Sequence, residues 1–202
     1  MKIIRKNYLI LIIGLTILIL YLTLIIYNNK LDQTTKYTES GETNYENDWL
    51  RSNFYFNNKY EGVYFYDSIC ESFENTNIHL SELVKERAIL IFNYSYLNCN
   101  TCYEEEISIF NEVFKNNIDE ALILCKYEIK RDYLVFRKFN KSEIPIYRIL
   151  SRSNFADEID APFYFLLHND LRMTHLFIPE KQYPEKSKQY LEKMKRLLNT
   201  EA

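Results

Sequence analysis

Two cysteines with two residues between them constrain this 202-residue chain more than any other feature. Cys99 and Cys102 stand between an apolar run at residues 88–92, typical of a buried strand, and a stretch from Tyr103 to Lys115 with helical spacing. At the first turn of a helix such a pair is close enough to form a disulfide, and the helix end stabilises a thiolate. The motif therefore predicts a redox dithiol on a strand-loop-helix unit.

An uncharged apolar run, residues 8–27, follows a basic N-terminus that contains Lys2, Arg5 and Lys6. A helix needs about 20 apolar residues to cross a bilayer, and the basic flank places Met1 in the cytoplasm. A cleaved signal peptide would have a shorter apolar region that ends in a small-x-small site, which this run lacks. We therefore expect a retained signal anchor in the cytoplasmic membrane, with the soluble domain in the periplasm or outside.

Charge and length narrow the function classes. The chain has 25 basic and 28 acidic residues, and three of the basic ones precede the apolar run. The part after the run is therefore acidic, which argues against a nucleic-acid partner. We expect a cytoplasmic N-terminus at residues 1–7, the membrane anchor at 8–27, a polar tether at 28–55, and one domain with a hydrophobic core at 56–202.

Apolar patterns in the domain alternate between strand-like and helix-like segments. Strands are predicted at residues 63–66, 78–80, 88–92, 121–125, 144–149, 163–167 and 172–178, and helices at 103–115, 132–140 and 184–198. Pro145 places its strand towards an edge of the sheet. This order predicts an α/β domain, with a mixed central sheet and helices on both faces.

The chain resembles the thioredoxin-like superfamily, and within it the membrane-anchored, extracytoplasmic TlpA-like and redoxin-like thiol-disulfide oxidoreductases. The resemblance covers about residues 77–198. It rests on the strand that runs into Cys99-Asn-Thr-Cys102, on the Ala161-Pro162 step that opens a hairpin, and on the C-terminal helix. The length of residues 127–160 fits the insertion that TlpA-like members carry.

This resemblance implies a thioredoxin-like fold and a role for three residues. Cys99 would be the attacking thiolate, Cys102 the resolving thiol, and Pro162 a cis-proline that faces the disulfide and holds the substrate backbone. Protein thiols and disulfides would be the substrates, and an upstream thiol-disulfide protein would be the electron donor. No cofactor is implied.

The sequence departs from the family pattern around the dithiol. Asn98 stands where a tryptophan usually precedes the first cysteine, and Asn93 occupies the position at which thioredoxin has a buried acid. Residues 104–106 are three glutamates that we expect in the first turn of the helix, where their charge would raise the pKa of the thiol. That effect favours a reductant.

Other uses of the four cysteines are less consistent with the sequence. A fixed disulfide between Cys99 and Cys102 would close a very small loop and add little stability. A zinc site needs a second pair of ligands, which the sequence lacks, so no metal is expected. A peroxiredoxin would need proline and threonine before its cysteine. Cys125 reads as a buried core thiol, whereas Cys70 could be buried, free or paired.

Two functions from different classes follow. The first is a membrane-anchored thiol-disulfide oxidoreductase that reduces or isomerises protein disulfides through Cys99 and Cys102. The alternative is a non-catalytic thioredoxin-like module, which binds an extracytoplasmic partner protein on the surface around Pro162.

Overall fold

The computed structural model describes Thr23 and residues 45–95, 100–150 and 158–201. The chain divides into two units, Met1–Leu50 and Arg51–Ala202. None of the helices within the described ranges is long and apolar enough to cross a membrane. Apart from Thr23, the expected anchor lies outside these ranges, so the membrane span stays a prediction.

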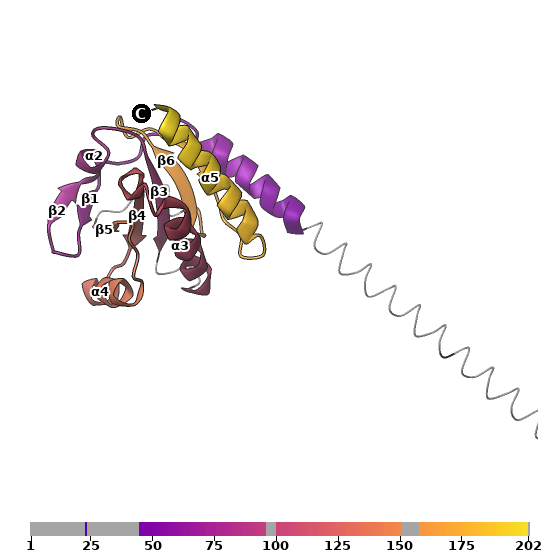
Figure 1. Ribbon diagram of the computed structural model, residues 1–202, viewed down its shortest axis with the longest axis horizontal. Helices are drawn as coiled ribbons and strands as arrows, with labels where there is room; N and C mark the ends of the chain where they lie inside the picture. Colours follow the sequence, from indigo (N-terminus) through magenta and orange to yellow (C-terminus); the bar gives the residue numbers. More distant parts are fainter. Residues whose placement is uncertain (1–22, 24–44, 96–99, 151–157, 202) are drawn as a thin grey trace, which may run out of the picture. The chain divides into compact units, whose positions relative to one another are not determined.

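Among the described residues, seven strands of the second unit form one mixed sheet (Figure 1). They are β1 (Ile69–Glu71), β2 (Asn77–His79), β3 (Ile89–Ser95), β4 (Ala121–Lys126), β5 (Ile146–Ile149), β6 (Phe163–Leu167) and β7 (Met173–Phe177). Their order across the sheet is β2-β1-β5-β4-β3-β6-β7. β3, β4 and β5 run parallel, and the remaining pairs are antiparallel. The segments that follow the three parallel strands therefore lie along one edge of the sheet.

Strand β3 lies inside the sheet and is buried on both faces. Leu90, Phe92 and Tyr94 belong to one apolar cluster, and Ile89 and Ile91 belong to the other. Successive side chains of a strand point to opposite faces, so this division follows from the strand geometry. A strand covered on both faces needs a continuous apolar run, which is the pattern that predicted a strand here.

Helices cover both faces of the sheet, as the sequence predicted. They are α2 (Leu80–Leu83), α3 (Asn100–Phe114), the short 3₁₀ helix η1 (Ile118–Glu120), α4 (Lys130–Phe139), α5 (Pro184–Glu201) and, from the helix at residues 45–60, the part that belongs to the second unit, residues 51–60. α3, α4 and α5 contribute to the cluster that contains Phe92, and α2 contributes to the other. α3 and α5 pack against each other in front of the sheet (Figure 1).

The helix at residues 45–60 overlaps the predicted tether at its residues 45–55. Within the second unit, Asn53 binds the backbone of Ile178 twice, because its Nδ2 donates to the carbonyl at 3.0 Å and its Oδ1 accepts from the N–H at 2.6 Å. Tyr60, one turn after Phe56, is buried in the second apolar cluster. Contacts with residues that are distant in the sequence therefore stabilise this helical segment, although its own sequence has little periodicity.

Strand β5 was expected at an edge, and that prediction is wrong. β1 pairs with β5 on the side away from β4, and β2 lies outside β1. Pro145 is compatible with this inner position because it precedes the first paired residue and loses no ladder hydrogen bond. Its carbonyl accepts a bond from the N–H of Ile123 at 2.9 Å.

The strand predicted at residues 63–66 is reduced to one isolated bridge, between Tyr64 and Arg172. The N–H of Phe65 donates to the carbonyl of Leu171, and the carbonyl of Val63 accepts from Met173, both at 2.8 Å. The alternating pattern was therefore a sign of one-sided packing, in which Phe65 is buried and the tyrosines on either side are exposed.

Candidate functional site

The predicted dithiol lies at the junction of β3 and α3. β3 ends at Ser95 and α3 begins at Asn100, so Cys102 is the third residue of the helix. Cys99 lies outside the described residues. The junction is at the edge where the parallel strands end, and the first N–H groups of an α-helix, which have no partner within the helix, favour negative charge. This is the environment in which a thiolate is stabilised.

α3 starts earlier than the sequence pattern predicted, and this changes the role of its glutamates. Because the helix begins at Asn100, its first turn contains no acidic residue, and residues 104–106 follow in the second turn. The prediction that all three occupy the first turn is wrong. The helix pattern was read from apolar residues alone, and the residues before Tyr103 are polar.

Pro162 lies next to this junction. It is buried and directly precedes β6, whose first residue, Phe163, pairs with Asn93 of β3. The structure therefore brings Pro162 to the end of β3 that leads into the dithiol motif. No peptide bond among the described residues is cis, and these include Ala161 and Pro162. The expected cis isomer is thus wrong; trans is the form that an X-Pro bond intrinsically prefers, by about 0.5–1 kcal/mol.

The three glutamates of α3 differ sharply in environment. Glu104 and Glu105 are exposed, whereas Glu106 is only 4% exposed. Its Oε2 accepts a hydrogen bond from Tyr164 Oη at 3.0 Å, and its Oε1 accepts one from Ser187 Oγ at 2.9 Å. Burial raises the pKa of the Glu106 carboxyl to about 7, and these two hydrogen bonds oppose the rise.

Aromatic rings surround the partner of Glu106 and account for this burial. The Tyr164 ring lies 4.6 Å from that of Phe92, 5.4 Å from that of Phe110 and 5.9 Å from that of Tyr190, measured between centroids. Burial also raises the pKa of Tyr164 well above its usual value, so its hydroxyl remains a donor. The carboxyl therefore lies in a largely apolar environment with two hydroxyl partners.

Sequence reasoning treated the three glutamates as equivalent and missed Glu106. A signal was present, since Glu106, Phe110 and Val113 follow the spacing of one helix face, and the latter two are buried. Its hydrogen-bonding partners belong to β6 and α5, which are far away in the sequence.

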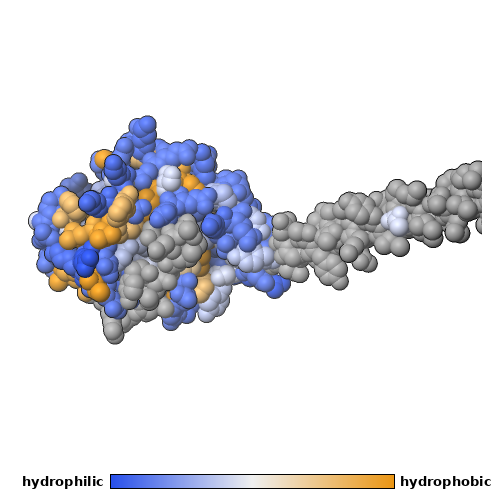
Figure 2. Space-filling view, turned by 90° about the horizontal axis from the view of Figure 1, so that it is seen from below, coloured by the Kyte–Doolittle hydropathy of each residue, from blue (hydrophilic) through white to orange (hydrophobic). Residues whose placement is uncertain are grey.

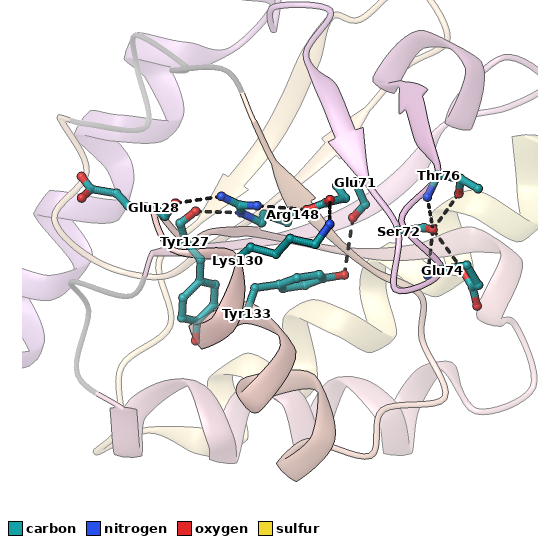
Figure 3. Close-up of polar contacts among 9 residues, drawn as sticks. All are labelled: Glu71, Ser72, Glu74, Thr76, Tyr127, Glu128, Lys130, Tyr133 and Arg148. Atoms are coloured by element: carbon teal, nitrogen blue, oxygen red, sulfur yellow. Dashed lines mark hydrogen bonds and ion pairs between the residues drawn. The ribbon is translucent and has the colours of Figure 1, made fainter.

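A second polar network lies along the same edge of the sheet (Figure 3). Both Lys130 and Arg148 form ion pairs with the buried carboxylate of Glu71. Arg148 also donates to two carbonyls of the segment after β4, at Tyr127 and Glu128, with distances of 2.9 and 2.8 Å. These ion pairs lower the pKa of Glu71, Lys130 having the larger effect. The network fixes the β1-β2 hairpin and the segment after β4 to β5.

The other two cysteines are buried, free thiols. Cys70 belongs to one apolar cluster and Cys125 to the other, so they lie on opposite faces of the sheet. Burial raises the pKa of Cys70 to about 12 and that of Cys125 still higher. Their burial makes both thiols poor nucleophiles.

Large apolar side chains are exposed around α4. Ile129 is 60% exposed just before the helix, and Val135 and Phe139 on α4 itself are 46% and 78% exposed. Figure 2 shows several hydrophobic areas separated by hydrophilic ones on one face of the domain. Exposed side chains of this size are compatible with contact to another protein.

No family model matches the sequence, and no curated protein matches it. Comparison with solved structures identifies the fold. The chain is similar to a thiol:disulfide interchange protein from Bacteroides sp., with a TM-score of 0.52 and 9% identity over 69% of this chain and 90% of that one. It is also similar to a protein from Chlorobium tepidum assigned as the thiol:disulfide interchange protein DsbE, with a TM-score of 0.50 and 12% identity over 65% and 94%. The chain therefore has an α/β fold of the thioredoxin type.

Proposed function

We propose that this protein is a thiol-disulfide oxidoreductase that reduces or isomerises protein disulfides through Cys99 and Cys102. One observation carries the proposal: the second cysteine of a Cys-x-x-Cys sequence is the third residue of α3, which follows β3, and Pro162 directly precedes the strand β6 that pairs with β3. The similarity of the fold to thiol:disulfide interchange proteins supports it. The exposed apolar side chains around α4 support a protein substrate.

Exchange would take place in two steps. The thiolate of Cys99 attacks one sulfur of a substrate disulfide, and a mixed disulfide forms as the other substrate sulfur leaves as a thiolate. The thiolate of Cys102 then attacks the sulfur of Cys99, so the Cys99–Cys102 disulfide forms and the second substrate sulfur is released. Two electrons pass to the substrate, and each released thiolate takes up a proton.

We further propose that residues 8–27 anchor the protein in the cytoplasmic membrane, with the domain in the periplasm or outside. The uncharged run and its basic flank support this orientation. Disulfides persist in such oxidising compartments, so substrates would be present there. An upstream thiol-disulfide protein would return the Cys99–Cys102 disulfide to the dithiol.

The glutamates in the second turn of α3, residues 104–106, favour reduction as the direction. A carboxylate near the dithiol disfavours the thiolate, and an unstable reduced form makes a pair more reducing. We expect the reduction potential of the pair to be near that of thioredoxin, roughly -270 mV. A potential near about -120 mV would instead indicate an oxidant.

Single-cysteine variants of the full-length protein test the function. Cys99→Ser and Cys102→Ser should abolish catalytic reduction of a model protein disulfide, and Cys102→Ser should accumulate mixed disulfides through Cys99. Cys125→Ser is the matched control, because it replaces a buried thiol outside the site and should remain active. If both site variants reduced the disulfide as fast as the unmodified protein, the enzyme proposal would be wrong. Partner binding that is unchanged in these variants would then indicate the non-catalytic binding module.

A further inference from the structure

We propose that the outward face of α4 and the hollow beside it form a docking site for a segment of a substrate protein that has both acidic and large apolar side chains. This inference rests on the proposed function and deepens it, because it names the kind of substrate. β4 runs parallel to β3, so α4, which follows β4, starts at the same edge of the sheet as α3 (Figure 1). A protein held on α4 would therefore lie at the edge from which the dithiol helix starts.

The outward face of α4 has the spacing of a packing face, although it is exposed. Arg131, Val135, Lys138 and Phe139 occupy positions i, i+4, i+7 and i+8, so they lie on one side of the helix. All four side chains are exposed, that of Val135 to 46% and that of Phe139 to 78%. Large apolar side chains grouped in this way on a surface are typical of a site that another protein covers.

The charge of the outward face indicates the chemistry of its partner. The chain is acidic overall, yet this face carries Arg131 and Lys138. Neither cation forms an ion pair with any of the described residues, and Asp132 is the only acidic residue of α4. Exposed cations without partners attract carboxylates. The face therefore fits a segment in which acidic side chains stand among apolar ones.

A hollow of about 620 Å³ adjoins the end of α4. Phe139 lines it from α4, Ile107 and Asn111 line it from α3, and the segment after α4 completes it. Asn111 holds that segment in place, because its Oδ1 accepts hydrogen bonds from Ser142 Oγ at 2.8 Å and from the N–H of Glu143 at 3.2 Å. The hollow is therefore formed before a partner arrives, which lowers the entropic cost of binding.

A protein segment fits this surface better than an anionic lipid bilayer does. The lining of the hollow has more carboxylates than amines, namely Glu104, Glu112 and Glu143 against Lys115 and Lys141. The headgroups of an anionic bilayer form a continuous negative surface, which would meet these carboxylates as well as the cations of the outward face. A polypeptide can place its acidic side chains against the cations alone and another side chain in the hollow. The charge pattern therefore favours a protein.

Binding of synthetic peptides to the full-length protein tests the site. The probe is a fluorescent peptide of glutamate, leucine and phenylalanine, and the control peptide has lysine in place of glutamate. The acidic peptide should bind more tightly, and its affinity should fall with added salt, which screens exposed charges. Phe139→Ser and Lys138→Glu should each weaken its binding about tenfold, and Lys138→Glu should also reduce the salt dependence.

Two matched controls replace similar side chains elsewhere in the domain. Phe54→Ser replaces a phenylalanine that is 73% exposed, and Lys193→Glu replaces an exposed lysine of α5. Both proteins should bind the acidic peptide as tightly as the unmodified protein does. Equal affinity for the two peptides, or full affinity in Phe139→Ser and Lys138→Glu, would refute the docking site.

Two further measurements separate this inference from its neighbours. The reconstituted protein should bind the acidic peptide equally in vesicles of phosphatidylcholine and in vesicles that also contain phosphatidylglycerol. Loss of binding in the second kind alone would show that the face binds anionic lipid, and would refute a protein partner. Peptide binding needs no thiol chemistry, so its failure would leave the proposed function intact. Failure of the protein to reduce any model disulfide would instead overturn the proposed function, and with it the link between docking and exchange.

Discussion

Replacement of Glu106 by glutamine should change how stability depends on pH. Glutamine has nearly the same shape, can accept from Ser187 and donate to Tyr164, and carries no charge at any pH. The buried carboxyl, with its pKa raised from 4.5 to about 7, is ionised at pH 8 in a site that disfavours the charge. The substitution removes the free-energy cost of this buried charge and changes no other interaction by a comparable amount.

The magnitude follows from the pKa. Each pKa unit corresponds to about 1.4 kcal/mol, so the ionised carboxyl destabilises the fold by about 3 kcal/mol relative to the unfolded chain. Because the folded pKa lies above the unfolded one, the folded state binds more protons between these values. The free energy of unfolding therefore falls as pH rises from 4.5 to about 7, and the full cost is present above about pH 7.

Urea unfolding of both proteins across this pH range is the assay. The difference in the free energy of unfolding, variant minus unmodified protein, cancels the titration of other groups. It should rise with pH and reach about 2 kcal/mol in favour of Glu106→Gln above about pH 7, after about 1 kcal/mol is deducted for a weaker hydrogen bond. Glu105→Gln should show no such trend, because Glu105 is exposed. A difference that did not vary with pH would refute the reasoning.

Three other predictions concern the rest of the domain. Glu71→Gln should lower the free energy of unfolding, measured with urea, by roughly 3 kcal/mol, because it leaves the largely buried Arg148 without its carboxylate. The folded protein lowers the pKa of Glu71, so this loss of stability should become smaller as the pH falls through that pKa. Tyr133→Phe should cost about 1 kcal/mol, the value of its hydrogen bond at 3.1 Å to a β5 carbonyl, and unchanged stability would show that the bond contributes nothing. In a variant without the dithiol, Cys70 and Cys125 should react with a thiol reagent only after denaturation; rapid labelling of the folded protein would contradict their burial.

Much of the element order could be predicted from local sequence patterns. The runs that became β3, β4, β6 and β7 and the spacing that became α5 are confirmed to within a few residues. These elements are long or strongly apolar, so their periodicity is evident without knowledge of their neighbours. The short strand β1 was missed because its three residues, Ile69–Glu71, have no such pattern and depend on pairing with β5.

The edge position predicted for β5 failed for a related reason. Proline excludes a central place only where its missing N–H would be part of the ladder, and Pro145 precedes the paired residues. The outer side of β5 is covered by β1, whose residues lie about 75 positions earlier in the chain, as the contact of Arg148 with Glu71 shows. No local pattern contains that information.

The sequence by itself determined the long, strongly apolar elements of the chain, and it predicted that the Cys99-Asn-Thr-Cys102 motif follows a strand and leads into a helix. Periodicity and motif spacing are local properties, because they depend only on the order of the residues along the chain. Only the tertiary structure decided that Glu106, and not Glu104 or Glu105, is buried, because its hydroxyl partners are 58 and 81 residues away. The ionisation of a carboxyl depends on the groups that replace water around it, and folding alone brings those groups together.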